Sequence, residues 1–215
     1  VIPLGFDLER FNTDKDSKRK EFRKKWNLKE NEIAIGIIGR LVPIKNHKFF
    51  IDAIQEVLKN SKVPIRAFIV GDGEEKQNII NYIKNKNLDF SLNYNPATFQ
   101  LTSWIKEIDR VNSGMDIICL TSLNEGTPVS LIEAQASGKP IVSTKTGGIE
   151  NIVLENKTAL LSEKNDLHNF SKNLLSLVND SNKRKLFSKF GLEKSKDFQY
   201  NQLVNNIKNL YENML

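Results

Sequence analysis

The sequence has few of the residues that stabilise small secreted or metal-dependent folds. Its 215 residues include one cysteine, Cys119, and two histidines. A single cysteine excludes an internal disulfide bond and fits a reducing compartment, and no cluster of Cys and His residues offers a zinc site. We therefore expect a cytoplasmic protein without a bound metal, whose fold depends on its own hydrophobic core.

Long apolar runs are also absent. The longest, Ile33 to Gly39, is flanked by Glu32 and Arg40 and is far shorter than the roughly 20 residues that span a bilayer. The sequence shows no signal peptide, no repeat and no low-complexity tract. Because the first residue is Val1 rather than Met, we expect the chain to be part of a longer gene product.

The composition is that of an ordinary globular protein. Hydrophobic residues make up 39% and charged residues 27%, and 32 Lys and Arg against 26 Asp and Glu give a net charge of +6. Disorder is excluded by this balance, and the length fits one large domain or two small ones. A positive charge favours anionic partners, namely phosphate ligands, acidic membrane surfaces or nucleic acid, but selects none of them.

From residue 31 onward, short apolar runs alternate with helical patterns. This alternation is typical of βα units on a parallel sheet. We predict an α/β fold, a doubly wound Rossmann-like sheet with helices on both faces and a helical C-terminal tail. The expected regions are a lead-in segment with a docked helix (1–30), the sheet domain (31–195) and a C-terminal helix (196–215). The predicted strands are 33–39, 65–71, 99–104, 115–122 and 140–144, with a short one at 159–162.

Ligands of such sheets bind outside the carboxyl ends of the strands, and the loop Gly39 to Asn46 follows the first one. Gly39 allows close backbone approach, while Arg40 and Lys45 offer positive charges beside a helix start at His47. These features outline a phosphate site, although neither a Walker loop nor G-x-G-x-x-G is present. A solvated Arg and Lys flanking a turn explain the loop equally well.

The loop Asn124 to Ala134 follows the strand at 115–122 and opens a helix. Helix starts favour anions, and Pro128 suits the first turn. Glu125 precedes the helix and Glu133 lies within it, so both carboxylates are available to accept hydrogen bonds from hydroxyl groups. A ligand with phosphates and many hydroxyls, such as a nucleotide sugar, meets these demands. A helical glutamate with a local partner is the alternative for Glu133.

Three other features are less specific. Gly147 and Gly148 after the strand at 140–144 permit either close backbone approach to a ligand or a plain tight turn. Trp104 either flanks a nucleobase or packs at a strand end. The basic stretch 18–25 favours a solvated helix face, with contact to anionic lipid at the inner face of a membrane as the second possibility.

Taken in order, GIIGRLVPIKNHKFFIDA, FIVGDGEEK and DIICLTSLNEGTPVSLIEAQASGKPIVSTKTGGIENIV resemble one known family, as does the opening VIPLGFDLERF. The chain is similar to the C-terminal, nucleotide-sugar-binding half of GT-B glycosyltransferases of family 4. The most specific match is Glu125 and Glu133 with seven residues between them. Thr127-Pro128 replaces the Phe-Gly of many relatives, and Glu150-Asn151 replaces their Pro-Glu.

The resemblance implies a retaining transfer of a sugar from a nucleotide diphosphate donor to an acceptor hydroxyl, without a metal or other cofactor. It implies that Arg40 and Lys45 hold the diphosphate, that Glu125 contacts the donor sugar, and that Glu133 accepts from the ribose. Residues 102–105, including Trp104, would lie beside the base. The remaining donor-binding residues implied by the match are Gly39, Gly126, Thr127, Pro128, Val129, Gly147 and Gly148.

The same resemblance implies a role in polysaccharide or glycoconjugate synthesis. An N-terminal domain outside the chain would bind the acceptor, a saccharide or lipid-linked glycan, and the isolated chain would bind donor but barely catalyse transfer. Three alternatives remain open at this stage. They are a nucleotide-sugar epimerase of the same architecture, a phosphorylase with a pyridoxal cofactor, and a non-catalytic nucleic-acid-binding domain.

Overall fold

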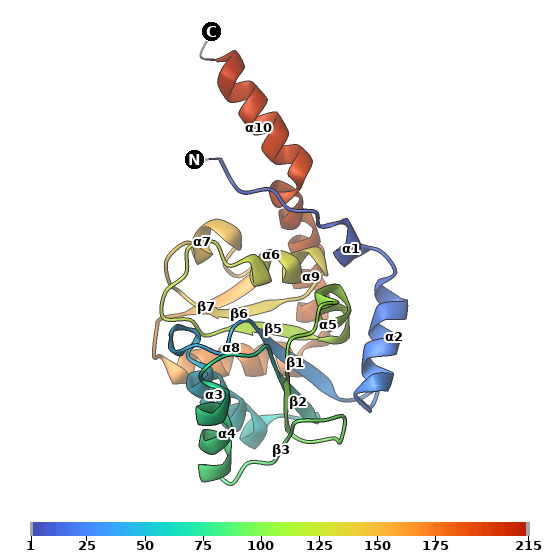
Figure 1. Cartoon of the computed structure of the whole chain (residues 1–215), viewed down its shortest axis with the longest axis vertical. Coiled ribbons are helices and arrows are strands. Elements are labelled where there is room, and N and C mark those ends of the chain that lie inside the picture. The colour runs from blue at the N-terminus through green and yellow to red at the C-terminus, as the bar shows by residue number, and fades with distance from the viewer. Residues whose placement is uncertain (1, 214–215) are drawn as a thin grey trace.

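The computed structural model describes residues 2–213, which form a single parallel sheet flanked by helices (Figure 1). All pairings between its strands are parallel, and their order is β3-β4-β2-β1-β5-β6-β7. The predicted doubly wound α/β fold is therefore confirmed. The strands are β1 (Ile33–Ile38), β2 (Ile65–Val70), β3 (Phe90–Ser91), β4 (Phe99–Thr102), β5 (Ile117–Leu120), β6 (Ile141–Thr144) and β7 (Ala159–Ser162).

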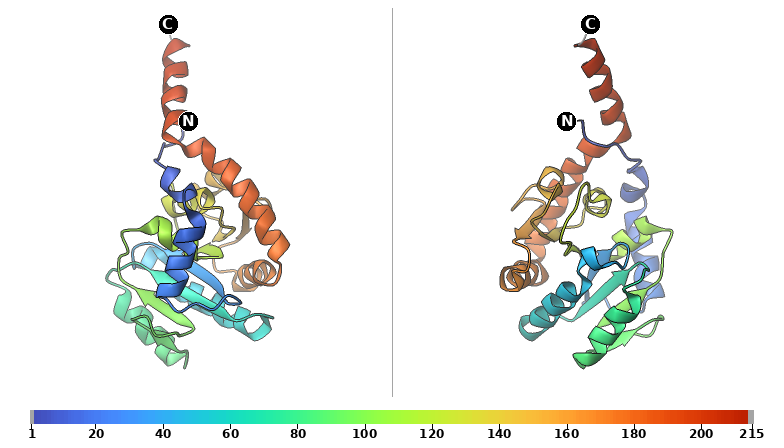
Figure 2. Two further views of the ribbon diagram at one scale, coloured as in Figure 1. Left: turned by 90° about the vertical axis from the view of Figure 1, so that its right-hand side faces the viewer. Right: turned by 60° about the vertical axis from the view of Figure 1, so that its left-hand side comes forward.

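Helices cover both faces of this sheet, as its continuously apolar strands require. In β1, Ile35 and Ile37 face a core formed with α3, α4 and α8, whereas Ala34 and Ile38 face a core formed with α1, α2, α5, α6 and α7. Figure 2 shows these two layers from the side. The helices are α1 (Glu9–Asn12), α2 (Lys15–Lys25), α3 (His47–Asn60), α4 (Lys76–Asn85), α5 (Ile108–Gly114), α6 (Val129–Ala136), α7 (Ile149–Ile152), α8 (Leu167–Asn179), α9 (Ser181–Ser195) and α10 (Tyr200–Glu212), with short 3-10 turns η1 (Pro43–Lys45) and η2 (Lys196–Phe198).

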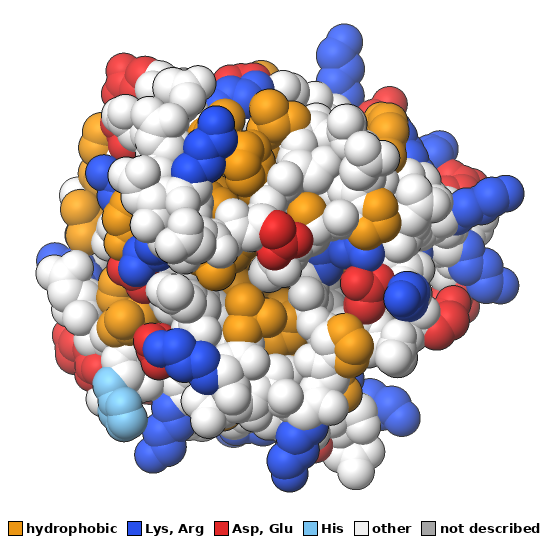
Figure 3. Space-filling model, turned by 90° about the horizontal axis from the view of Figure 1, so that it is seen from below, with side chains coloured by type: hydrophobic (Ala, Val, Ile, Leu, Met, Phe, Trp, Pro, Cys, Tyr) orange, Lys and Arg blue, Asp and Glu red, His pale blue; other side chains and the backbone are white. Residues whose placement is uncertain are grey.

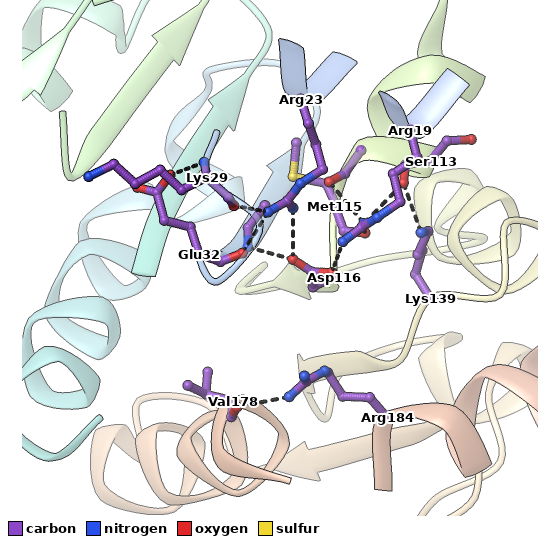
Figure 4. A network of polar contacts seen from close by, with 12 residues as sticks. Arg19, Arg23, Lys29, Glu32, Ser113, Met115, Asp116, Lys139, Val178 and Arg184 are labelled. Atoms are coloured by element: carbon purple, nitrogen blue, oxygen red, sulfur yellow. Dashed lines mark hydrogen bonds and ion pairs between the residues drawn. The ribbon is translucent and has the colours of Figure 1, made fainter. Parts of the chain in front are cut away.

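The lead-in helix α2 docks on the sheet domain, as predicted. Phe22 and Trp26 are buried, and Trp26 packs edge-on against Phe68 of β2 with ring centroids 5.6 Å apart. Figure 4 shows that two α2 guanidinium groups, those of Arg19 and Arg23, bind Asp116 at 2.7 and 3.2 Å. Part of the basic stretch 18–25 therefore holds the helix in place, so it is not simply a solvated face.

Four short elements were not predicted: α1, β3, α5 and α7. Strand β3 has two residues and depends on pairing with β4 at the edge of the sheet. Helix α5 has seven residues, among them Asn112, Ser113 and Gly114, which are weak helix formers. It exists because its buried side packs against α2, and such a tertiary contact leaves no periodic signal in the sequence.

The predicted helical C-terminal tail is present, and residues 214–215 of the helix expected over 196–215 lie outside the described residues. Helix α10 differs from the helices before it in its surroundings. None of its side chains is buried by the described residues 2–213, and it projects away from the sheet (Figure 1). Its base is held by the N-terminal segment, because Phe6 and Tyr200 are joined by a backbone hydrogen bond of 3.1 Å. No helix in the described part of the chain has the length and apolar character needed to cross a membrane.

Candidate functional site

The strand order reverses between β1 and β5, and the loops that leave these two strands meet at their carboxyl ends. From β1 the chain proceeds to β2 on one side, while β5 pairs with the other side of β1. Open α/β sheets bind ligands at such a reversal, because the two loops diverge there and leave a crevice. Here the loops are joined by a backbone hydrogen bond of 2.8 Å from Leu123 to Ile44.

Lys45 and Glu125 form an ion pair across this junction. The Nζ of Lys45 lies 2.5 Å from Oε1 of Glu125, and the two side chains are 22% and 10% exposed. The hydroxyl of Ser122 donates to the same Oε1 at 2.6 Å. Because the pair is shielded from water, salt screens it less than a surface pair. The fold therefore brings together two residues that the sequence had marked in separate loops.

Arg40 lies in the same loop as Lys45 and is exposed. Its backbone carbonyl accepts a hydrogen bond from Val42 at 3.0 Å, which shapes the turn before η1. Gly39 is partly exposed at the end of β1, and a methyl group on it would make only ordinary contact with Lys45. The loop thus places one exposed guanidinium and one shielded ammonium at the end of a central strand.

The double glycine after β6 packs against the Glu125 loop. Gly147 has φ +53°, and a Cβ on it would lie 1.8 Å from the carbonyl oxygen of Glu125. A Cβ on Gly148 would lie 2.0 Å from the carbonyl oxygen of Gly126. The Gly148 N–H donates to the backbone carbonyl of Glu125 at 3.0 Å. Close backbone approach therefore requires both glycines. The partner seen here is the neighbouring loop, and contact with a ligand remains a prediction.

The segment before α6 is open to solvent and leads into a helix start. Gly126 and Thr127 are exposed, and no atom lies within 4 Å of a Cβ placed on Gly126. Pro128 is the N-cap residue of α6, one position before the predicted first turn, and Val129 is the first helical residue. The N–H groups of Val129 and Ser130 precede the first helical hydrogen bond and favour an anion, whereas that of Leu131 donates to the carbonyl of Pro128 at 3.0 Å. This end of α6 suits a phosphate or a sugar oxygen.

Glu133, one turn further along α6, lines a pocket of about 350 Å³. Burial raises the pKa of this carboxyl from 4.5 to about 7, with the charge of Arg10 acting in the opposite direction. The other residues around the pocket are Phe6, Asp7, Leu8, Arg10, Phe11 and Val129. The N-terminal segment thus forms one wall, a contribution that the spacing of the two glutamates did not predict.

Trp104 stands beyond the end of β4 and is 59% exposed. Core packing, the alternative interpretation of this side chain, is therefore wrong. The adjacent Ser103 accepts a hydrogen bond from Lys76 at 3.0 Å, and Lys76 also pairs with Asp72 at 2.9 Å. The Trp104 indole is free to meet a planar ligand, although its role beside a base remains a prediction.

His47 and Cys119 behave as structural residues. His47 is the first residue of α3 and is buried; burial lowers the pKa of its imidazole to about 4, with the nearby charge of Lys45 acting in the same direction. The side chain is therefore neutral at pH 7. Cys119 is buried in β5, and burial raises the pKa of its thiol.

Sequence reasoning missed four hydroxyl groups that organise the site. Each hydroxyl lies at the carboxyl end of β5 or β6 and is bonded to a loop that carries candidate residues. The only signal in the sequence was a pair of small polar residues directly after an apolar strand. The bonds run from Thr121 to the carbonyl of Lys45, from Ser122 to Glu125, from Thr144 to the carbonyl of Ser122, and from Thr146 to the carbonyl of Leu123.

Comparison with known proteins identifies the family. A family model described as glycosyl transferases group 1 matches residues 18–194, which is most of the chain. The chain belongs to this family. A relative at 33% identity over 218 residues is the Escherichia coli UDP-Gal:alpha-D-GlcNAc-diphosphoundecaprenol alpha-1,3-galactosyltransferase, and the match covers 100% of this chain and 54% of that protein. An uncharacterised glycosyltransferase of Methanocaldococcus jannaschii is 29% identical over 86% of this chain and 50% of its own length.

Solved structures agree on the fold of this group 1 domain. HepE from Anabaena, in complex with UDP and glucose, superimposes with a TM-score of 0.83 at 21% identity, over 97% of this chain and 55% of that one. The C-terminal domain of the group 1 protein LpcC from Francisella tularensis gives 0.75 at 21% identity, over 91% of this chain and 100% of that one. The chain spans about half the length of the curated relatives it matches, and it corresponds to a C-terminal domain of the GT-B architecture.

The family match does not support the epimerase, phosphorylase or nucleic-acid alternatives. On the face drawn in Figure 3, lysine and arginine side chains stand mostly around the rim and are interspersed with acidic ones. A nucleic-acid surface gathers its basic residues into one patch or stripe. The charges on this face are instead typical of an ordinary solvated surface.

Proposed function

We propose that this chain is the donor-binding half of a retaining glycosyltransferase that moves a sugar from a nucleotide diphosphate sugar to an acceptor hydroxyl. The observation that carries the proposal is the Lys45–Glu125 pair, 2.5 Å apart at the strand-order reversal and next to the start of α6. It joins a cation suited to phosphate with a carboxylate suited to sugar hydroxyls. Membership of the group 1 family supports the same reaction class.

In the proposed reaction, the bond between the sugar's anomeric carbon and the diphosphate oxygen breaks, the acceptor oxygen bonds to that carbon, and the proton of the acceptor hydroxyl passes to the departing diphosphate. The departing diphosphate carries away the electron pair, so negative charge grows on its phosphates. The ammonium of Lys45 and the exposed guanidinium of Arg40 stabilise that charge through charge-assisted hydrogen bonds. Two cations in this position make a metal unnecessary, so we expect transfer to be metal-independent.

The remaining donor contacts follow from the same placement. Glu125 accepts hydrogen bonds from the donor sugar, and the exposed residues Gly126, Thr127 and Val129 supply N–H groups to the sugar or phosphate, with the buried Pro128 shaping the segment between them. Glu133 accepts from the ribose within its pocket of about 350 Å³. The exposed indole of Trp104 stacks on the base. We propose uracil as that base, because the relative at 33% identity is named for UDP-Gal and HepE was solved with UDP.

The acceptor site belongs, in this proposal, to the half of the relatives that lies outside the chain. Helix α10 offers a docking surface for that half, because Leu203, Val204, Ile207 and Leu210 form an apolar stripe at helical spacing and none of them is buried. A saccharide or lipid-linked glycan is the proposed acceptor, in polysaccharide or glycoconjugate synthesis. The corresponding location is the cytoplasm, with peripheral contact to the inner face of the membrane.

The proposal is tested by calorimetric titration of the chain with UDP, GDP and ADP, first without and then with magnesium. We expect UDP to bind best and magnesium to leave its affinity unchanged. Lys48→Ala is the matched control for Lys45→Ala, because Lys48 is exposed on the first turn of α3. Absence of binding by all three nucleotides, or equal binding by both lysine variants, would contradict the proposed site.

A further inference from the structure

Two consecutive hydroxyl groups at the end of β5 hold the two halves of the ion pair. The Thr121 Oγ1 donates to the carbonyl of Lys45 at 2.8 Å and also lies 3.1 Å from the carbonyl of Asn46. The Ser122 Oγ donates to Oε1 of Glu125 at 2.6 Å. Both residues are fully buried. The end of β5 therefore contacts both members of the ion pair: the backbone of Lys45 and the carboxylate of Glu125.

The strand end that carries these hydroxyls is itself fixed. Thr144 of the neighbouring strand β6 donates its hydroxyl to the carbonyl of Ser122 at 2.8 Å, in a buried setting. Lys45, in contrast, reaches Glu125 through a flexible four-carbon chain. Of the two donors to Glu125 Oε1, the serine is thus the immobile one and the lysine the movable one.

The ammonium of Lys45 has three N–H groups, so it is able to donate to a diphosphate while it keeps its bond to Glu125. Binding of UDP alone therefore does not leave the carboxylate, which is only 10% exposed, without a donor. The Ser122 hydroxyl remains on Oε1. It keeps the carboxylate in place and leaves Oε2 available to a ligand hydroxyl.

We propose that Ser122 and Thr121 are positioning residues, Ser122 for the Glu125 carboxylate that meets the donor sugar and Thr121 for the Lys45 segment that meets the diphosphate. The inference rests on the proposed function and assigns a separate ligand group to each hydroxyl. Ser122 acts on the sugar through Glu125. Thr121 acts on the diphosphate by fixing the backbone between η1 and α3.

The test compares UDP with UDP-galactose by calorimetry on the chain and its variants. We expect Ser122→Ala to lower the affinity for UDP-galactose about tenfold, the scale of a lost hydrogen bond to a charged group, and to leave the UDP affinity within about twofold. Thr121→Val is expected to lower the affinity for both ligands by about the same factor. Ser122→Thr and Thr121→Ser keep the hydroxyl groups, so we expect them to bind both ligands like the unsubstituted chain.

Ser171→Ala is the matched control, because Ser171 is buried on α8 and its hydroxyl has no hydrogen-bond partner among the described residues. If Ser122→Ala weakens UDP and UDP-galactose equally, or if Ser122→Thr fails to rescue, the positioning role of Ser122 is wrong. If the unsubstituted chain binds both ligands and Glu125→Gln loses the sugar contribution while Ser122→Ala does not, the inference fails and the proposed function survives. Failure of the unsubstituted chain to bind either ligand overturns both.

Discussion

The backbone N–H of Gly148 donates to the carbonyl oxygen of Glu125 at 3.0 Å, so the loop after β6 lies directly against the loop after β5. Gly147 approaches the same carbonyl so closely that a Cβ would lie 1.8 Å from it. The double glycine therefore controls where Glu125 stands. A side chain at either glycine would push the two loops apart.

Gly147→Ala should lower the free energy of unfolding by roughly 2 kcal/mol, because alanine disfavours a left-handed backbone and its methyl group would overlap the Glu125 carbonyl. Denaturant unfolding followed by circular dichroism measures this. Gly126→Ala is the control, since open space surrounds that position. Equal stability of the two variants would show that the loops adjust without cost.

Arg40→Ala and Lys45→Ala should each weaken the binding of a nucleoside diphosphate at least tenfold and leave nucleoside binding nearly unchanged. Only the diphosphate makes charge-assisted hydrogen bonds with these side chains. Calorimetric titration with UDP and with uridine measures the difference. Equal losses for the two ligands would remove the diphosphate assignment.

Glu133→Gln should weaken UDP more than its 2′,3′-dideoxy counterpart, because only UDP offers ribose hydroxyls to the carboxylate. The same variant has a pH signature. Burial raises the pKa of Glu133 in the folded state from 4.5 to about 7, so the folded chain binds the extra proton between these values. The contribution of Glu133 to stability is therefore full below pH 4.5 and is lost as pH rises toward 7.

Urea unfolding of the chain and of Glu133→Gln between pH 5 and 8 isolates this contribution as the difference between the two curves. Subtracting the two curves cancels the contributions of other groups that titrate in this range. One of them is His47: its pKa is lowered in the folded chain, so stability rises with pH until the pH reaches 6.5, the ordinary pKa of histidine. Parallel curves would mean that the Glu133 carboxyl titrates normally. Identical losses of UDP and dideoxy-UDP binding would separately remove the ribose contact.

Lys139→Met should change the dependence of stability on pH above 7. Lys139 donates to the carbonyl of Ser113 at 3.0 Å (Figure 4), and burial, together with the charge of Arg19, lowers the pKa of its ammonium from 10.5 to about 7. Between these values the unfolded chain holds a proton that the folded chain has lost, so stability rises with pH. Guanidinium unfolding at pH 7 and 9 should show this rise in the chain and in the exposed-lysine control Lys20→Met, and its absence in Lys139→Met.

The pattern of apolar residues predicted the central strands and the long helices, because that pattern is visible within each segment of the sequence. The run from Ile33 to Gly39 is apolar throughout, as a strand covered on both faces must be, and the helix from His47 has apolar residues on one face. Short elements carried no such signal. Helix α5 and strand β3 exist only because α2 and β4 lie beside them.

Motif spacing marked Lys45, Glu125 and Gly147 as candidate residues, but it did not predict which of them contact one another. The lysine and the glutamate are eighty residues apart, and they meet because the sheet places β5 next to β1 rather than next to β4. The sequence alone predicted that Gly147 forms either a tight turn or a contact with a ligand. Its closeness to the Glu125 carbonyl depends on the pairing of β5 with β6.

The sequence by itself determined the fold class, because burial on both faces of a parallel sheet imposes apolar runs that composition and spacing reveal. It also determined which side chains are able to bind phosphate and hydroxyl groups, since that is a property of each residue type. Only the tertiary structure decided that Ser122 and Lys45 share one oxygen of Glu125, and that Arg10 and Glu133 line the same pocket. These contacts depend on the order of the strands and on how closely the loops after them pack, and both exist only in the folded chain.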